Sequence, residues 1–193
     1  MSRAESWHRC RPRLNAAALL TAVCAFMVVA SSVTQRPRES DVEAAYLFNF
    51  AKFMHASAHS PDSFTIAVVG KSAIGPMLGT ITANEQIDGR PLKVVQPATV
   101  DAARNCDIVF LADTETPHLD KDLATLAGSN ALTVSNAPEF LQHGGMIQFL
   151  VVNDRVRFKV NLDASNKEKI AFSSELLRVA MSVSGSPGGE AQP

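Results

Sequence analysis

The feature that most restricts the fold is a pair of apolar-rich segments, Met146–Val152 and Arg155–Val160, joined only by Asn153-Asp154. Asn and Asp tolerate the positive φ that a two-residue turn requires. Two such segments separated by two turn residues predict a tight antiparallel hairpin. The second half of the chain is therefore expected to contribute two neighbouring strands to a sheet.

Short apolar runs alternate with segments of helical spacing before and after this hairpin. We expect strands where the runs are short, apolar and bounded by turn residues, at Phe64–Val69, Leu92–Val95, Cys106–Leu111 and Leu132–Ser135. We expect helices or helical turns at Asp41–Met54, Ser72–Leu78, Thr99–Arg104, Pro117–Ala127, Pro138–Gln142 and Phe172–Val183. This order predicts the α/β class, as a single-domain α/β sandwich with a mixed sheet and a C-terminal β-hairpin plus helix.

The first and last of these helices carry the clearest local signals. Ser40 and Glu43 have the spacing of a capping box, so Ser40 is expected to cap the first helix. The first helix is apolar on two faces, which predicts that it is largely enclosed or lends one face to another molecule. In the last segment, apolar residues from Phe172 to Val183 recur on one helical stripe.

The N-terminal residues have the layout of a secretory signal peptide. A head with four arginines precedes an apolar run from Ala16 to Ala30, and small residues follow. The run has about fifteen apolar residues, fewer than the roughly twenty of a membrane span, although a retained anchor is the alternative. We expect a signal peptide at 1–32, a short leader at 33–40, the domain at 41–184 and a disordered Gly/Pro/Ser-rich tail at 185–193.

Charge and cysteine content narrow the function further. After loss of residues 1–32, 14 Lys and Arg face 18 Asp and Glu, so the mature net charge is −4. Such a chain lacks the basic footprint of a nucleic-acid binder. Cys106 is then the one remaining cysteine, and its position at the start of an apolar run predicts a buried thiol rather than a dimer linker.

No segment carries a complete catalytic, cofactor or metal motif. Gly70-Lys71-Ser72 lacks the earlier glycine of a phosphate-binding loop, and His55 and His59 lie in a segment broken by Pro61. Ser173-Ser174-Glu175 has no partner base and is better explained as a helix cap. We therefore expect no catalytic, cofactor-binding or metal residues and no enzymatic activity.

Two surfaces are candidates for partner binding. Arg155, Arg157 and Lys159 alternate with apolar residues along the second hairpin strand and form a positive strip, here called the basic strip. The strip is either an ordinary solvated sheet face or a surface for an acidic partner. Tyr46 and Phe50, on the first helix, are the second candidate.

Four segments, in order, resemble the YfiR-like family (DUF4154), which has the patterns KAAFLYNFAKFV, CHILFI, LTVSD…F…GGMI and RFEINL…SSQLLRLA. The matching segments here are 44–53, 106–111, 132–147 and 157–180. The resemblance extends from about Asp41 to Val183. The chain departs from it where Asp107 replaces the common His and where the paired cysteines of the best-known members are missing.

The resemblance implies a periplasmic domain that represses an inner-membrane diguanylate cyclase by binding its periplasmic portion, and so lowers cyclic di-GMP and biofilm formation. A sensor kinase is the other membrane partner that it implies, and a homodimer is a candidate assembly. A small-ligand sensor or solute-binding domain that works with a sensor kinase is the alternative function, and an exported hydrolase is the third.

Overall fold

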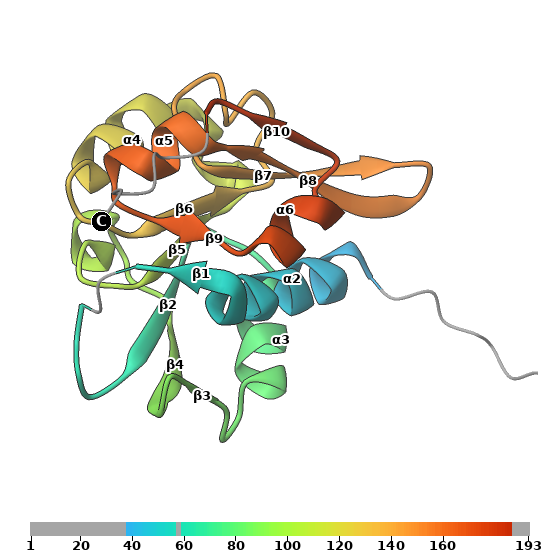
Figure 1. The fold of residues 1–193 in the computed structure, drawn as a ribbon. Helices are drawn as coiled ribbons and strands as arrows, with labels where there is room; N and C mark the ends of the chain where they lie inside the picture. Colours follow the sequence, from blue (N-terminus) through green and yellow to red (C-terminus); the bar gives the residue numbers. More distant parts are fainter. Residues whose placement is uncertain (1–37, 57–58, 187–193) are drawn as a thin grey trace, which may run out of the picture. The chain divides into compact units, whose positions relative to one another are not determined.

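The computed structural model describes residues 38–56 and 59–186 (Figure 1). The predicted signal peptide, most of the leader and most of the predicted tail lie outside these residues. The described residues form a mixed α/β domain around an eight-stranded sheet, which confirms the predicted fold class. None of the helices in this described part combines the length and the hydrophobicity needed to cross a membrane.

The large sheet has the strand order β10-β8-β7-β6-β5-β2-β4-β3. Its centre is parallel and consists of β2 (Phe64–Val69), β4 (Arg90–Val95), β5 (Ile108–Leu111), β6 (Leu132–Ser135) and β7 (Ile147–Val152). Antiparallel pairing occurs between β7 and β8 (Arg155–Asn161) and between β4 and β3 (Gln86–Ile87), while β10 (Ser182–Ser184) pairs in parallel with β8. A second sheet pairs β1 (Met54–His55) with β9 (Ala171–Phe172).

The hairpin forms as predicted. Asn153 and Asp154 have φ of 51° and 58°, the left-handed values of a tight two-residue turn. The strands pair from Val152 and Arg155 to Ile147 and Val160. Figure 1 shows the tip of this hairpin extending beyond the helices.

The two faces of the large sheet are covered by different helices. On one face lie α2 (Glu39–Phe53), α3 (Ile74–Ile81) and α6 (Ser174–Val179); on the other lie α4 (Leu119–Leu126) and the short 3₁₀ helices η1 (Asp101–Ala103) and η2 (Asp113–His118). The connection after β8 forms α5 (Leu162–Lys167). In Figure 1, α2 and α3 lie to the right of β2 and β4, and α4 and α5 lie together at the upper left.

Each face has its own hydrophobic core, because alternate strand residues point to opposite sides. The core under α2 and α3 includes four fully buried phenylalanines, Phe50, Phe110, Phe149 and Phe158. The core under α4 is built from smaller side chains together with Phe140; its strand residues are Ala67, Val69, Val109 and Leu111. The sheet therefore separates two hydrophobic cores, and each of its faces packs against one of them.

The start of the first helix differs from the prediction. The helix begins at Glu39, and the Asp41 carboxylate accepts the backbone N–H of Arg38 at 3.2 Å. Ser40 lies inside the helix and does not cap it. Glu43 does not reach back to Ser40 but is buried at 6% exposure, with a side-chain hydrogen bond to Asn136. The predicted capping box is wrong because Glu43 is held by the sheet end beneath the helix.

The predicted C-terminal helix is also wrong in extent. Ser173 caps α6 by accepting the Leu176 N–H at 3.3 Å, and the chain turns extended at Ala180, with φ −62° and ψ 142°. The next residues pair with β8 as β10, where the Met181 N–H donates to the Phe158 carbonyl at 2.8 Å. Hydrogen bonding to the open edge of β8 satisfies the backbone groups of this segment, and this effect outweighs its helical pattern.

Smaller differences occur elsewhere. Pro138–Gln142 is a turn rather than a helix, with Glu139 at φ 59°. The segment predicted as helix from Ser72 begins at Ile74, and the predicted turn at Thr99–Arg104 narrows to η1. The prediction missed α5 and the short strands β1, β3 and β9.

Candidate functional site

The basic strip lies on the hairpin face that points away from α2. Arg155 and Arg157 are exposed and Lys159 is partly exposed, while Val156, Phe158 and Val160 on the other face are buried. The strip lies next to Asp154, in the hairpin turn. Its members are about 7 Å apart along the strand, so the strip concentrates positive charge without adding to stability.

Tyr46 and Phe50 belong to an aromatic cluster between α2 and the hairpin. The Phe50 ring centroid lies 5.0 Å from Phe158 and 5.7 Å from Phe149, and the Tyr46 centroid lies 5.3 Å from Phe158. Phe50 is only 1% exposed, whereas Tyr46 is partly exposed. Phe50 is therefore a core residue first, and only its edge is available to a partner.

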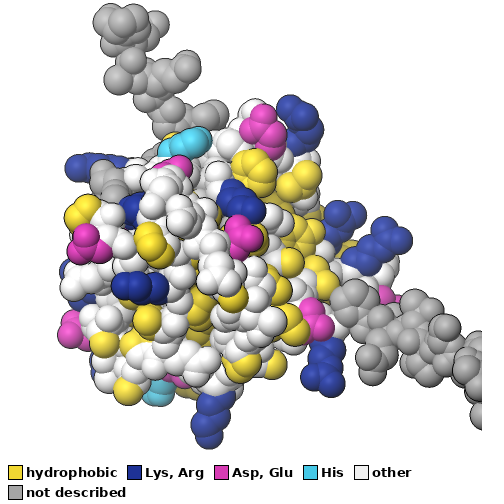
Figure 2. Space-filling view, turned by 90° about the horizontal axis from the view of Figure 1, so that it is seen from below, with side chains coloured by type: hydrophobic (Ala, Val, Ile, Leu, Met, Phe, Trp, Pro, Cys, Tyr) yellow, Lys and Arg dark blue, Asp and Glu magenta, His cyan; other side chains and the backbone are white. Residues whose placement is uncertain are grey.

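This edge forms part of a groove between α2 and α6, here called the α2–α6 groove. Its volume is about 190 Å³, and its lining is Tyr46, Asn49, Phe50, Phe53, Phe158, Glu175, Leu176 and Val179. Phe53 and Val179 are 38% and 57% exposed, so the groove is apolar where it meets solvent. Seen from the side of α2 and α3, hydrophobic side chains gather in one area beside Lys and Arg side chains (Figure 2).

The sequence prediction missed Phe53 and Val179 at this groove. Phe53 lies seven residues, or about two helical turns, after Tyr46, so helical spacing could have placed it on the same side of α2. Val179 had no such signal, because the predicted long helix placed it on a buried stripe.

The basic strip and the α2–α6 groove lie on opposite faces of the sheet. Phe158 points toward α2 and lines the groove, and its neighbours Arg157 and Lys159 point to the other side. The structure therefore separates the two predicted surfaces instead of joining them. One partner molecule would have to wrap around the hairpin to contact both.

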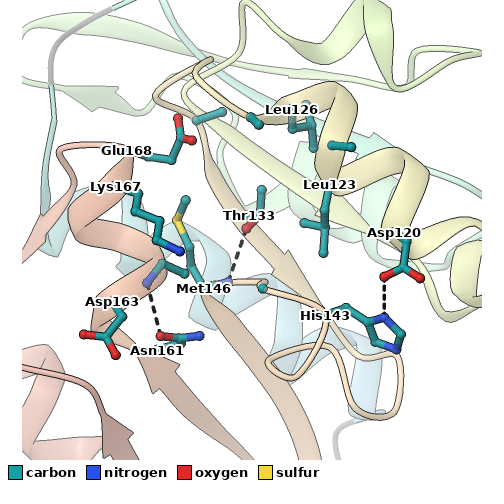
Figure 3. A pocket seen from close by; sticks show the side chains of 15 residues that line it. Asp120, Leu123, Leu126, Thr133, His143, Met146, Asn161, Asp163, Lys167 and Glu168 are labelled. Carbon is teal, nitrogen blue, oxygen red and sulfur yellow. Dashed lines mark hydrogen bonds and ion pairs between the residues drawn. The ribbon is translucent and has the colours of Figure 1, made fainter.

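A larger cleft opens on the face of the strip, between α4, α5 and the loop before β7 (Figure 3). Its volume is about 430 Å³. Thr133 and Met146 lie in its middle, where the Thr133 hydroxyl accepts the Met146 N–H at 3.3 Å. Asp120 and His143 form one side through a 2.6 Å contact. Lys167 lies on the opposite side.

Two kinds of contact fix the residues at the border of this cleft: hydrogen bonds from backbone N–H groups and close packing against a glycine. The Glu168 carboxylate accepts the N–H groups of Gly128 and Asn130, each at 2.8 Å. A Cβ at Gly145 would lie 2.2 Å from the Phe140 ring, so this position requires glycine. These contacts join segments from residue 120 to residue 168, which is why no local sequence pattern predicted the cleft.

The incomplete phosphate-loop and histidine motifs of the sequence have structural roles. The turn after β2 has Gly70 at φ +86°, and Ser72 Oγ accepts the Ile74 N–H at 3.2 Å. His59 lies at 3.6 Å from the Asp107 carboxylate, which also accepts from Thr65 N–H at 2.8 Å. Among the described residues, no three His, Cys, Asp or Glu side chains are grouped so as to hold a metal ion.

Two buried groups have perturbed acidity. Burial, then the charges of Glu39 and Asp113, raise the pKa of Glu43 to about 7, against the hydrogen bond from Asn136. Cys106 is buried at 6% exposure, which confirms the predicted burial. Burial and the neighbouring Asp107 raise the pKa of its thiol, so the thiolate needed for reaction is disfavoured.

The described residues thus form an α/β domain with two cores, an apolar groove and clefts with charged rims. The sequence places this domain in a known family. The chain belongs to the YfiR/HmsC-like family (DUF4154), whose model matches residues 40–181. This is a family of periplasmic regulators that are not catalytic and that interact with a membrane partner.

Solved structures with the same fold are only distantly related. A conserved domain protein of Vibrio cholerae O1 biovar El Tor has a TM-score of 0.54 at 10% identity, over 76% of this chain and 60% of that one. The ABC domain of Streptococcus pneumonia in complex with L-Trp has a TM-score of 0.52 at 9% identity, over 75% of this chain and 60% of that one. The chain thus spans about three fifths of each relative. No curated protein matches its sequence.

Proposed function

We propose that this chain is a periplasmic repressor that binds the periplasmic portion of an inner-membrane diguanylate cyclase and so lowers cyclic di-GMP. Membership of a family of periplasmic regulators supports this proposal. The observation that carries it is the α2–α6 groove, where Phe53 and Val179 expose apolar surface at the edge of an otherwise buried aromatic cluster. Apolar side chains that line an open groove give a partner a place to bury apolar surface.

Repression in this proposal needs no catalysis. A membrane receptor with two states shifts when a periplasmic protein binds one state more tightly than the other. A difference of about 10⁴-fold in affinity is enough to move the receptor from 1:99 to 99:1. The groove provides apolar contact for affinity, and the basic strip steers an acidic receptor surface toward the protein.

Export is part of the same proposal. The basic head and short apolar run at 1–32 support cleavage of a signal peptide. N-terminal sequencing of the exported protein should then find a start near residues 31–36. An intact Met1 in the membrane fraction would contradict cleavage.

The test is the cyclic di-GMP content of cells that lack the gene. Deletion should raise cyclic di-GMP, and the wild-type gene should restore the low level. Phe53→Ser with Val179→Ser should fail to restore it, whereas Val95→Ser should succeed, since Val95 is also 38% exposed but lies on β4, away from the groove. If deletion leaves the level of cyclic di-GMP unchanged, the cyclase is not the partner. Altered signalling by a sensor kinase in the deletion strain would then identify the kinase as the partner.

The cleft of Figure 3 supports a second function, that of a small-ligand sensor. Its volume of about 430 Å³ is in the usual range of small-molecule sites, roughly 300–1,000 Å³. A thermal-shift screen of small metabolites on the exported protein tests this function. A ligand whose effect is lost in Thr133→Val, and kept in Val95→Ser, would favour the sensor.

A further inference from the structure

A second cleft lies at a position where α/β sheets often bind ligands. β2 and β5 are neighbours in the sheet, and the connections that follow them lead to opposite faces, through α3 and α4. Such a switch point leaves a crevice outside the carboxyl ends of the strands. Beside it is a cleft of about 310 Å³, lined by Val69, Ala98, Thr99, Val100, Asp101, Glu115, His118, Lys121, Asp122 and Thr125.

One residue of this cleft has an unmet hydrogen-bonding requirement. Asp122, on α4, is 8% exposed, and its Oδ2 has no hydrogen-bond partner among the described residues. A buried carboxylate oxygen without a donor destabilises the folded state. Oδ2 is itself covered, but Asp122 lines the cleft, so a turn of its carboxylate would bring this oxygen to a donor that enters the cleft.

The charges around Asp122 favour a cation as that donor. The cleft lining has three carboxylates, Asp101, Glu115 and Asp122, against Lys121 and the titratable His118. Neither Lys121 nor His118 lies within ion-pair distance of a described carboxylate. Burial and then the charge of Glu115 raise the pKa of Asp122, whereas His118 and Lys121 lower it.

The lining also limits the kind of cation. The described residues contain no group of three ligands suited to a metal ion, so the carboxylates are not preorganised for coordination. Val69 and Val100 are buried apolar residues and provide a surface for a short carbon chain. An ammonium group has three N–H donors, which can bond to carboxylate oxygens without a fixed coordination geometry.

We propose that this cleft binds a small aliphatic amine, with its ammonium group donating to Asp122 Oδ2 and Glu115 supplying a second negative charge. The site is independent of the partner proposed above, and it differs from the cleft of Figure 3. It would give the regulator a means of responding to amines outside the cytoplasmic membrane.

The test is titration calorimetry on the purified exported protein with 1,4-diaminobutane, butylamine and the neutral analogue 1,4-butanediol. Both amines should bind saturably and the diol should not. Asp122→Asn should weaken amine binding at least tenfold, and Glu115→Gln should weaken it several-fold. Glu85→Gln is the control, because Glu85 is exposed and lines none of the clefts described above.

Proton release gives a second readout that a merely structural role of Asp122 would not produce. An ammonium stabilises the charged carboxylate, so binding at mildly acidic pH should release protons in wild type and not in Asp122→Asn. The proposal is overturned if neither amine binds saturably in the millimolar range. It is also overturned if Asp122→Asn and Glu115→Gln both bind as wild type does, since the amine would then occupy another place.

Discussion

The two faces of the central sheet are built differently. The face under α2 is filled by phenylalanine rings in contact, with centroids 5.0 to 6.5 Å apart, and has a small apolar groove at its edge. The face under α4 is filled by Ala67, Val69, Val109 and Leu111 and opens as two larger clefts with charged rims. Large rings close a core and leave apolar edges, whereas small side chains leave room for polar clefts. In the proposals above, the groove of the first face provides the contact with the partner, the clefts of the second face bind small ligands, and the basic strip of the second face only steers the partner.

The largest expected effect on stability is at the centre of the aromatic face. Phe50→Ala removes a ring that contacts Phe149 and Phe158, and it should lower the free energy of unfolding by about 3–5 kcal/mol. Urea denaturation measures this change. Leu123→Ala, on the partly buried side of α4, is the control on the other face and should cost less. An equal loss in both variants would contradict the difference between the faces.

A smaller effect is expected from the pH dependence of Glu43. Its pKa is raised to about 7 in the folded protein, so the folded state binds more protons than the unfolded state between about pH 4.5 and 7. Stability should therefore fall as pH rises through this window, by up to about 3 kcal/mol. Glu43→Gln should remove most of this loss. Denaturant unfolding from pH 5 to pH 8 measures both proteins, and identical slopes would contradict the burial of a charged group.

Substitution and labelling of Cys106 test the packing of the core under α4. Cys106→Ser should cost about 1–3 kcal/mol, because the hydroxyl is left in an apolar site. The wild-type thiol should react slowly with a bulky maleimide until the protein is unfolded. Rapid labelling of the native protein, or a covalent dimer on a non-reducing gel, would show that the thiol is accessible.

The basic strip should matter least for stability. Arg155→Glu with Arg157→Glu should leave the midpoint of thermal unfolding nearly unchanged, because both side chains are exposed. Association with an acidic receptor surface should slow several-fold at low salt and less at high salt. Binding kinetics at two ionic strengths measure this. Equal association rates at low salt would identify the strip as an ordinary solvated face.

Local sequence signals predicted the elements that local physics determines. The Asn153-Asp154 turn, β2 and β6 follow from turn residues and from short apolar runs, and the structure places all three as expected. The extent of the last helix could not be predicted in this way. Ser182–Ser184 is a strand because β8 presents an unpaired edge, which is a property of the assembled sheet.

The candidate sites show the same limit more strongly. Tyr46 and Phe50 could be found from the two apolar faces of the first helix, but which of them is exposed depends on the hairpin packed against that helix. The sequence signal at Glu43 predicted a helix cap instead of a buried carboxyl, and Asp122 had no signal. Each is an ordinary acidic residue in the sequence, and its pKa is raised because the fold buries it near other carboxylates.

The most direct test of the central claim is the affinity of the exported protein for the periplasmic portion of its membrane receptor. Phe53→Ser with Val179→Ser should weaken binding at least tenfold and leave unfolding nearly unchanged, because both side chains are already exposed. Val95→Ser should bind as wild type does. If the groove variant binds the receptor as tightly as wild type, the α2–α6 groove is not the binding surface and the assignment of the two faces is wrong.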